Sequence, residues 1–144
     1  MVGACGEQEL YDAFSGIAGL ELDFVDQIKW SDPVAVSGAL WGMDIGLYPL
    51  LPNEFNEYKC GFKALEYMTM EIPVVSSDVA ENRSIIVDGK TGFFASNSDD
   101  WKLYLLQLIK RVELREKMGR AGKDIVVNRY SLKLAVEEFM GITG

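Results

Sequence analysis

The sequence lacks histidine altogether, although it has 144 residues. This absence excludes a Ser-His-Asp triad, a Cys-His pair, an HExxH zinc site and a histidine proton shuttle within the chain. Any catalysis by these residues has to use carboxylates, lysine, arginine, tyrosine or backbone dipoles.

Cysteine is nearly as scarce, because Cys5 and Cys60 are the only two. Without a CxxC motif, the chain has no disulfide framework, zinc ribbon or thioredoxin motif. No apolar run approaches the ~20 residues of a membrane-spanning helix, and the first residues lack the basic segment of a signal peptide. We therefore expect a cytoplasmic protein with two reduced thiols.

Basic residues are the minority, with 14 Lys and Arg against 22 Asp and Glu and a net charge of −8. This balance argues against a protein that binds nucleic acid or an anionic membrane. The basic residues that cluster near one helix predict a solvated helix face, with a partner or lipid surface as the alternative; they are Arg111, Arg115, Lys117, Arg120 and Lys123.

Apolar runs and helical periodicity alternate along the chain. They predict strands within residues 22–30, 45–51, 72–76 and 91–95, and helices over 62–70, from 98 onward, 113–127 and 131–140. Ser98 and Asp99 are expected to cap the helix that begins there. The alternation predicts an α/β class: a Rossmann-like three-layer domain with a parallel sheet and a helical C-terminal tail, whose ligand lies outside the carboxyl ends of the strands.

A candidate binding site follows the strand at 45–51, where a loop leads into the helix at 62–70. The start of a helix offers free N–H groups and a positive dipole end, and Gly61 lets a ligand approach the backbone. Lys59 and Lys63 are four residues apart, so we expect them to share one helix face. Glu66 is placed to accept hydrogen bonds from sugar hydroxyls.

These groups suit a ligand with a diphosphate at one end and a ribose at the other. An alternative remains open, in which Lys63 and Glu66 form a surface ion pair and Gly61 is only a loop residue. A signalling receiver would need a cluster of acidic residues with a lysine, and the sequence has no such arrangement.

Four segments together resemble one family. They are DIGLYPL at 44–50, KCGFKALEYM at 59–68, IPVVSS at 72–77 and DGKTGFFA at 88–95. Their order and spacing resemble the carboxyl-terminal, donor-binding domain of the retaining glycosyltransferases called group 1 or family 4, which have the GT-B fold of two Rossmann-like domains. Tyr130 and Ser131 stand where members often have an aromatic-Ser pair.

The resemblance implies a single donor-binding domain over residues 1–144, truncated at its amino terminus, with the basic pair that grips the diphosphate preceding Val2. The whole enzyme would transfer a hexosyl unit from a UDP- or GDP-sugar to a carbohydrate or lipid-linked acceptor in polysaccharide biosynthesis. It would need no cofactor and no metal, and it would be cytoplasmic with peripheral membrane contact. We expect the isolated chain to be inactive without a missing or separate amino-terminal acceptor-binding domain; the alternative is a non-catalytic nucleotide-sugar-binding or docking module that needs such a domain.

The resemblance also implies roles for single residues. Glu66 matches the glutamate that holds the ribose hydroxyls, Gly61, Phe62 and Lys63 match the segment that faces the donor sugar and phosphates, and Ile28 falls near the residue that meets the base. With Lys59, these form the predicted donor site, and no catalytic residue is assigned.

The sequence departs from the family pattern at two acidic positions. Tyr58 replaces the first glutamate of the Glu-x7-Glu motif, and Ser84 stands where members commonly have a further glutamate.

Overall fold

The computed structural model describes residues 8–21, 23, 25, 28–29, 31–51, 53–79 and 81–142. The chain divides into two compact units, Met1–Gly42 and Met43–Gly144. Within the described part of the chain, no helix is both long enough and apolar enough to cross a bilayer.

The first unit contains helices α1 (Gln8–Ser15) and α2 (Pro33–Leu40). Asp32 caps α2 by accepting a hydrogen bond from the Val34 N–H at 3.0 Å, and Pro33 suits the first helical position. The strand predicted within 22–30 lies partly outside the described residues. Of those described there, Val25 forms a single β-bridge, and Ile28 belongs to no helix or strand.

The second unit is built on a parallel sheet of three short strands, β1 (Gly46–Tyr48), β2 (Val74–Ser77) and β3 (Gly92–Ala95). The strands lie in that order, with Leu47 opposite Val75 and Val75 opposite Phe93. Three predicted strands are therefore confirmed, as are the α/β class and the parallel sheet.

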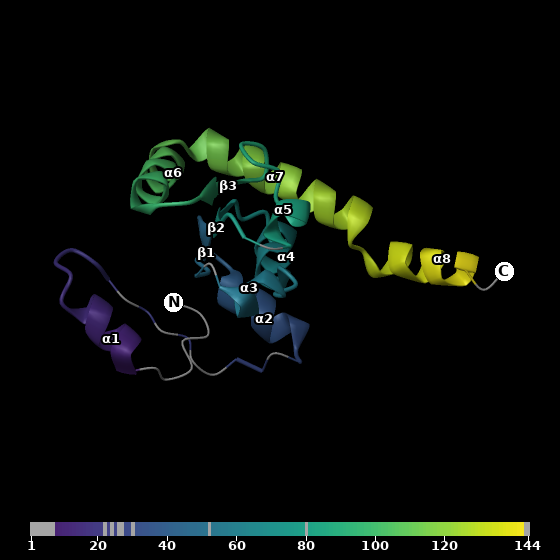
Figure 1. Ribbon diagram of the computed structural model, residues 1–144, viewed down its shortest axis with the longest axis horizontal. Coiled ribbons are helices and arrows are strands. Elements are labelled where there is room, and N and C mark those ends of the chain that lie inside the picture. The colour runs from purple at the N-terminus through teal and green to yellow at the C-terminus, as the bar shows by residue number, and fades with distance from the viewer. Residues whose placement is uncertain are drawn as a thin grey trace. The chain divides into compact units, whose positions relative to one another are not determined.

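Six helices accompany the sheet in the described part of this unit (Figure 1), and they are α3 (Glu54–Glu57), α4 (Phe62–Thr69), α5 (Asn82–Ile85), α6 (Ser98–Lys110), α7 (Val112–Arg129) and α8 (Leu132–Ile142). The helices predicted over 62–70 and beyond residue 98 are confirmed, whereas the short α3 and α5 were not predicted. The predicted cap of α6 is wrong by one residue. Asn97 accepts the N–H groups of Asp99 and Asp100, and the Asp100 carboxylate accepts the Ser96 N–H in return.

One core cluster joins the sheet to α6 and α7. Val75 and Ala95 from the strands are buried with Leu108 from α6 and Met118 from α7. The rings of Phe93 and Tyr104 stack beside this cluster with centroids 4.4 Å apart, so β3 and α6 are held face to face.

The helix α7 packs closely on α4 and on the turn that follows it. A Cβ at Gly119 would collide with the backbone carbonyl of Glu71, and one at Gly122 would lie 3.1 Å from the Met68 side chain. Glycine at both positions therefore lets the two helices approach. The Lys123 ammonium adds an ion pair with Glu71 at 2.7 Å, and its hydrogen bond lowers the pKa of that carboxyl.

The basic segment 111–123 contributes partly to this packing rather than to a uniformly solvated face. The Arg115 guanidinium pairs with Asp44 at 3.1 Å and donates to the Leu108 carbonyl at 2.7 Å, so it joins the start of β1 to the end of α6. The ion pairs of Arg115 with Asp44 and of Lys123 with Glu71 therefore explain why positions 115 and 123 hold basic residues.

The close packing of α7 against Glu71 predicts the effect of adding a side chain at Gly119. We expect Gly119→Ala to lower the free energy of unfolding by about 2 kcal/mol, because overpacking against rigid backbone costs up to about 3 kcal/mol and the gain in helix propensity returns about 1. Urea unfolding measures the change. The control is Gly141→Ala in α8, where nothing lies within 4 Å of the added methyl group; it should be neutral or stabilising. Equal stability of the two variants would contradict the close contact.

Candidate functional site

The candidate site is built around the first turn of α4, which begins beyond the carboxyl end of β1. Gly61 precedes the helix in the left-handed conformation, with φ +63° and ψ 12°. Its carbonyl accepts the N–H groups of Ala64 and Leu65 at 2.9 and 3.3 Å. No side chain caps this helix start, unlike those of α2, α3 and α6. The first amide groups of a helix have no partner within it, so this end is suited to an anion.

Gly61 packs against α5. A Cβ at Gly61 would collide with the Ile85 side chain and would lie 3.3 Å from the Asn82 amide oxygen. Asn82 is itself 1% exposed and donates to the Ser76 hydroxyl at 2.7 Å. The buried polar pair ties α5 to the end of β2, and it fixes the support on which Gly61 rests.

Lys63 and Glu66 form an ion pair on one flank of α4, with 2.8 Å between Nζ and Oε2. The two side chains are only 25% and 29% exposed. The Lys63 ammonium also lies 6.0 Å from the centre of the Tyr67 ring. The pair therefore places a partly desolvated cation and carboxylate one turn apart, beside the uncapped helix start.

Tyr67 anchors α4 to β1. Its ring covers Gly46, where a Cβ would lie 2.5 Å from it, and its hydroxyl donates to the Leu47 carbonyl at 3.3 Å. Burial, with smaller contributions from Glu66 and Tyr48, raises the pKa of Tyr67 to about 12. Burial also raises the pKa of Tyr48, where Cys60 and Glu66 add to the effect.

The loop after β1 is fixed by hydrogen bonds to the neighbouring strand. The Leu50 N–H donates to the Ser77 hydroxyl at 2.9 Å, and the Asn56 amide nitrogen donates to the Leu51 carbonyl at 2.8 Å. Asn53 caps α3 by accepting the Asn56 N–H at 2.8 Å. The segment that leads to Gly61 is therefore ordered by several independent contacts.

A hollow of about 490 Å³ opens on the other flank of α4. Phe62 and Leu65 line it, whereas Lys63 and Glu66 do not, as expected for a helix whose buried face carries Ala64, Tyr67 and Met68. Its lining consists of Tyr58, Lys59, Cys60, Phe62, Leu65, Glu81, Ile85 and Tyr130.

The structure brings five of the six predicted site residues to the start of α4, with one correction among them. Lys59 does not share a helix face with Lys63, because the left-handed Gly61 starts the helix only at Phe62. Lys59 lies in the preceding loop, where its N–H donates to the Asn56 carbonyl at 3.2 Å, and it lines the hollow instead. Ile28 is half-buried in the other compact unit.

The surroundings are completed by Tyr130 and Ser84, which the family pattern singled out without a predicted site role, and by Glu81, Asn82 and Ile85, which the sequence did not single out. Tyr130 reaches α5, where its hydroxyl donates to the Ser84 carbonyl at 3.3 Å, and the Ser84 hydroxyl donates to the Glu81 carboxylate. The contacts of Ile85 and Asn82 with Gly61 are tertiary. The sequence therefore carries no local signal for them beyond the apolar side chain of Ile85.

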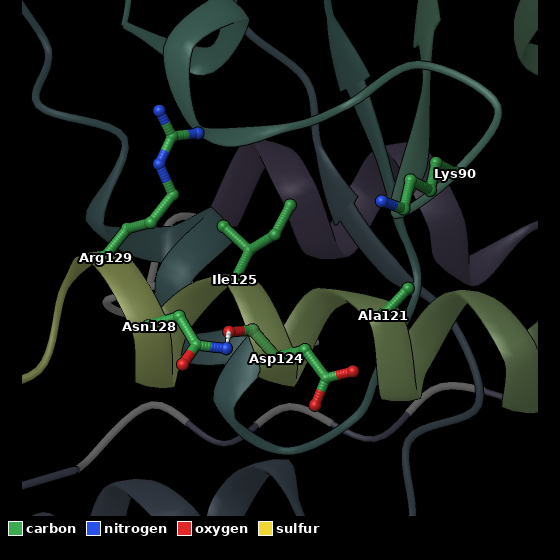
Figure 2. Close-up of a pocket in the computed structure, with 6 residues that line it drawn as sticks. All are labelled: Lys90, Ala121, Asp124, Ile125, Asn128 and Arg129. Carbon is green, nitrogen blue, oxygen red and sulfur yellow. Dashed lines mark hydrogen bonds between the residues drawn. The ribbon is translucent and has the colours of Figure 1, made fainter.

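A second hollow of about 250 Å³ lies along α7 (Figure 2). Ala121, Asp124, Ile125 and Asn128 follow one face of the helix, with Lys90 on the facing turn and Arg129 at the far end. The Asn128 amide is used within the helix, where it donates to the Asp124 carbonyl at 2.8 Å. This hollow contains none of the predicted site residues.

Comparison with known proteins gives a consistent family. The family profile described as "Glycosyl transferases group 1" matches residues 1–111. The chain is 30% identical over 102 residues to an alpha-D-kanosaminyltransferase of Streptomyces kanamyceticus, covering 69% of this chain and 26% of that protein. It is 27% identical over 110 residues to the capsular polysaccharide biosynthesis glycosyltransferase CapM of Staphylococcus aureus, covering 75% and 27%. The chain thus spans about a quarter of the length of these relatives.

Solved structures show the same fold. A sucrose-phosphate synthase from Thermosynechococcus elongatus superposes with a TM-score of 0.73 at 15% identity, over 94% of this chain and 32% of that one. A TarM variant from S. aureus, in complex with fondaparinux, alpha-GlcNAc-glycerol and UDP, gives a TM-score of 0.66 at 16% identity, over 93% and 25%. The Rossmann-like fold predicted from the sequence is confirmed.

The environment of Tyr67 predicts how stability depends on pH. Because its pKa is raised from 10.0 to about 12, folding favours the neutral phenol. The resulting stability is complete below pH 10 and is lost as the pH rises toward 12, by up to about 2–3 kcal/mol.

The comparison of wild type with Tyr67→Phe by urea unfolding isolates this loss from other titrations. Near pH 8 the variant should be less stable by about 1 kcal/mol, through the lost hydrogen bond, and above pH 11 the difference should vanish or reverse. The control Tyr58→Phe, at an exposed position, should change the free energy of unfolding at pH 8 by less than about 0.5 kcal/mol; a Tyr67→Phe difference that stays constant with pH would contradict the assignment.

Proposed function

The chain belongs to the group 1 glycosyl transferases, and on that premise we propose that it binds the nucleotide-diphosphate sugar of a retaining hexosyltransferase. The observation that carries the proposal is the half-buried Lys63–Glu66 pair beside the uncapped start of α4. A donor of this kind has a diphosphate and a ribose, and the site offers groups for both.

The charged groups of the site are assigned to different parts of the donor. The N–H groups at Phe62 and Lys63, with the Lys63 ammonium, face the diphosphate, and Lys59 adds a second cation from the loop. Glu66 accepts hydrogen bonds from the ribose hydroxyls. The contact of Ile28 with the base stays a prediction from the family resemblance.

The same groups support sugar transfer. Negative charge grows on the leaving diphosphate as the bond to the sugar breaks, and a preorganised helix start with Lys63 stabilises that charge. The acceptor attacks from the face that the diphosphate leaves, and the diphosphate takes the acceptor proton. This chemistry requires no histidine from the chain.

The acceptor half is proposed to be a missing or separate amino-terminal domain, so the chain alone binds the donor without turning it over. The name of the CapM relative supports polysaccharide biosynthesis as the setting. The scarcity of cysteine supports a cytoplasmic location, and a lipid-linked acceptor would bring peripheral membrane contact.

Calorimetric titration of UDP and GDP into the chain tests the donor site, with 2′-deoxy-UDP as the probe of ribose contact. We expect UDP or GDP to bind, and the deoxy nucleotide to bind at least about tenfold more weakly, since a hydrogen bond to a charged group contributes about 1.5–3 kcal/mol. In Glu66→Gln the difference between UDP and 2′-deoxy-UDP should shrink towards zero, even though the freed Lys63 can strengthen contact with the diphosphate.

The matched control is Glu116→Gln, which breaks an exposed helical ion pair with Arg120 at 3.5 Å. It should leave both affinities within about twofold, because exposed pairs contribute little. Failure of both nucleotides to bind at millimolar concentration would contradict the site, and so would a ribose preference that Glu66→Gln leaves unchanged.

A further inference from the structure

The hollow beside α4 has a lining unlike the charged flank of the same helix. Leu65 forms its apolar wall, backed by Ile85, which is only 1% exposed. Phe62, Tyr58 and Tyr130 add aromatic rings, and Lys59, Cys60 and Glu81 complete the lining. Its volume of about 490 Å³ falls in the range of small-molecule sites, which span roughly 300–1,000 Å³.

The polar groups around this hollow are partly engaged already. The Tyr130 hydroxyl uses its hydrogen to bind the Ser84 carbonyl at 3.3 Å. The Glu81 carboxylate accepts the Ser84 hydroxyl. Apart from Lys59 and the remaining acceptor sites of Glu81, a ligand in the hollow meets aromatic and aliphatic carbon.

The position of the hollow limits what can occupy it. Phe62 and Leu65 bring it to the first turn of α4, the same turn whose N–H groups are proposed to bind the diphosphate. In a nucleotide sugar, the hexose is joined directly to that diphosphate. The sugar is therefore the part of the donor that reaches the hollow when the phosphates lie at the start of α4.

We propose that this hollow holds the donor's hexose and selects hexoses that carry a methyl group, as an acetamido or a 6-deoxy substituent. The inference rests on the proposed donor-binding function. A fully hydroxylated hexose would lose water from hydroxyls that the Leu65–Ile85 wall cannot bond, which is unfavourable. A methyl group against the same wall gains from burial.

Tyr58 contributes to the selection. It stands at the position where the family pattern has a glutamate, and it is 83% exposed at the rim of the hollow. A carboxylate there would accept hydrogen bonds from sugar hydroxyls, whereas the ring of Tyr58 offers an apolar face to a C–H-rich surface.

Calorimetric titration of the full chain with matched donors tests the proposal. The pairs are UDP-glucose with UDP-N-acetylglucosamine, and GDP-mannose with GDP-6-deoxymannose, and UDP and GDP serve as references. We expect the methyl-bearing donor to bind at least about fourfold more tightly in one pair, which corresponds to one buried methylene-sized group. The pair in which the methyl-bearing donor binds more tightly shows whether the hollow selects an acetamido or a 6-deoxy substituent.

The outcomes separate this inference from the proposed function. If neither UDP nor GDP binds, the proposed function fails and the inference fails with it. If a nucleotide binds but the parent hexose is equal or preferred in both pairs, only the inference is overturned.

Variants test the wall itself. Leu65→Gln keeps the side-chain size but makes the wall polar, and the preference should fall below twofold while the affinity for the free nucleotide stays within twofold. Leu106→Gln, on the exposed side of α6, is the control and should keep the preference.

Should Leu65→Gln fail to fold, Tyr58→Glu at its exposed position supplies the same test, since it should shift the preference toward the hydroxylated hexose. A preference that survives in the folded variants would overturn the proposal.

Discussion

The contact between Gly61 and α5 decides where α4 begins, and the candidate site depends on that point. Gly61 adopts a left-handed backbone and packs against Ile85 with no room for a Cβ. A residue with a side chain would be strained in that conformation and would also push the loop away from α5. The helix start, its first N–H groups and the first residues of α4 are all positioned by this one packed glycine.

From that fixed start, α4 divides the site into two chemical environments. One flank carries the Lys63–Glu66 pair, and the buried face between the flanks is anchored on Gly46 and Leu47 by Tyr67. The other flank faces an aromatic and aliphatic hollow closed by Tyr130 and α5. Charged and apolar recognition thus lie within one helical turn of each other, which suits a ligand that joins a nucleotide diphosphate to a sugar.

The packing that supports α4 from outside the site is equally specific. The glycines at 119 and 122 bring α7 against α4, while Lys123 and Arg115 bind Glu71 and Asp44. The basic segment was predicted as a solvated face, with a partner or lipid surface as the alternative, and two of its residues instead hold parts of the fold together.

Local patterns predicted the elements well where the chain is apolar and punctuated. The runs around Val75 and Phe93 became strands, and the helical spacing predicted over residues 62–70 became α4. The sequence pattern failed where one residue changes the backbone. Gly61 ends the loop in a left-handed turn, so Lys59 lies outside α4 and does not share the helix face that its four-residue spacing to Lys63 predicted.

Tertiary contacts set the remaining limit on prediction. The hollow joins Tyr58 and Tyr130, which are far apart in the chain, and nothing local in either segment indicates that they meet. Asn97, rather than Ser98, caps α6 because its extended backbone precedes the first helical residue, and such boundaries shift easily by one position.

The central claim is that the start of α4 binds the nucleotide diphosphate, and amide chemical shifts measured during a UDP titration of the ¹⁵N-labelled chain test it most directly. The account predicts that the largest and saturable shifts occur at Gly61, Phe62, Lys63 and Glu66. Shifts centred instead on Lys90 and Arg129 at the α7 hollow, with the α4 amides unmoved, would contradict it.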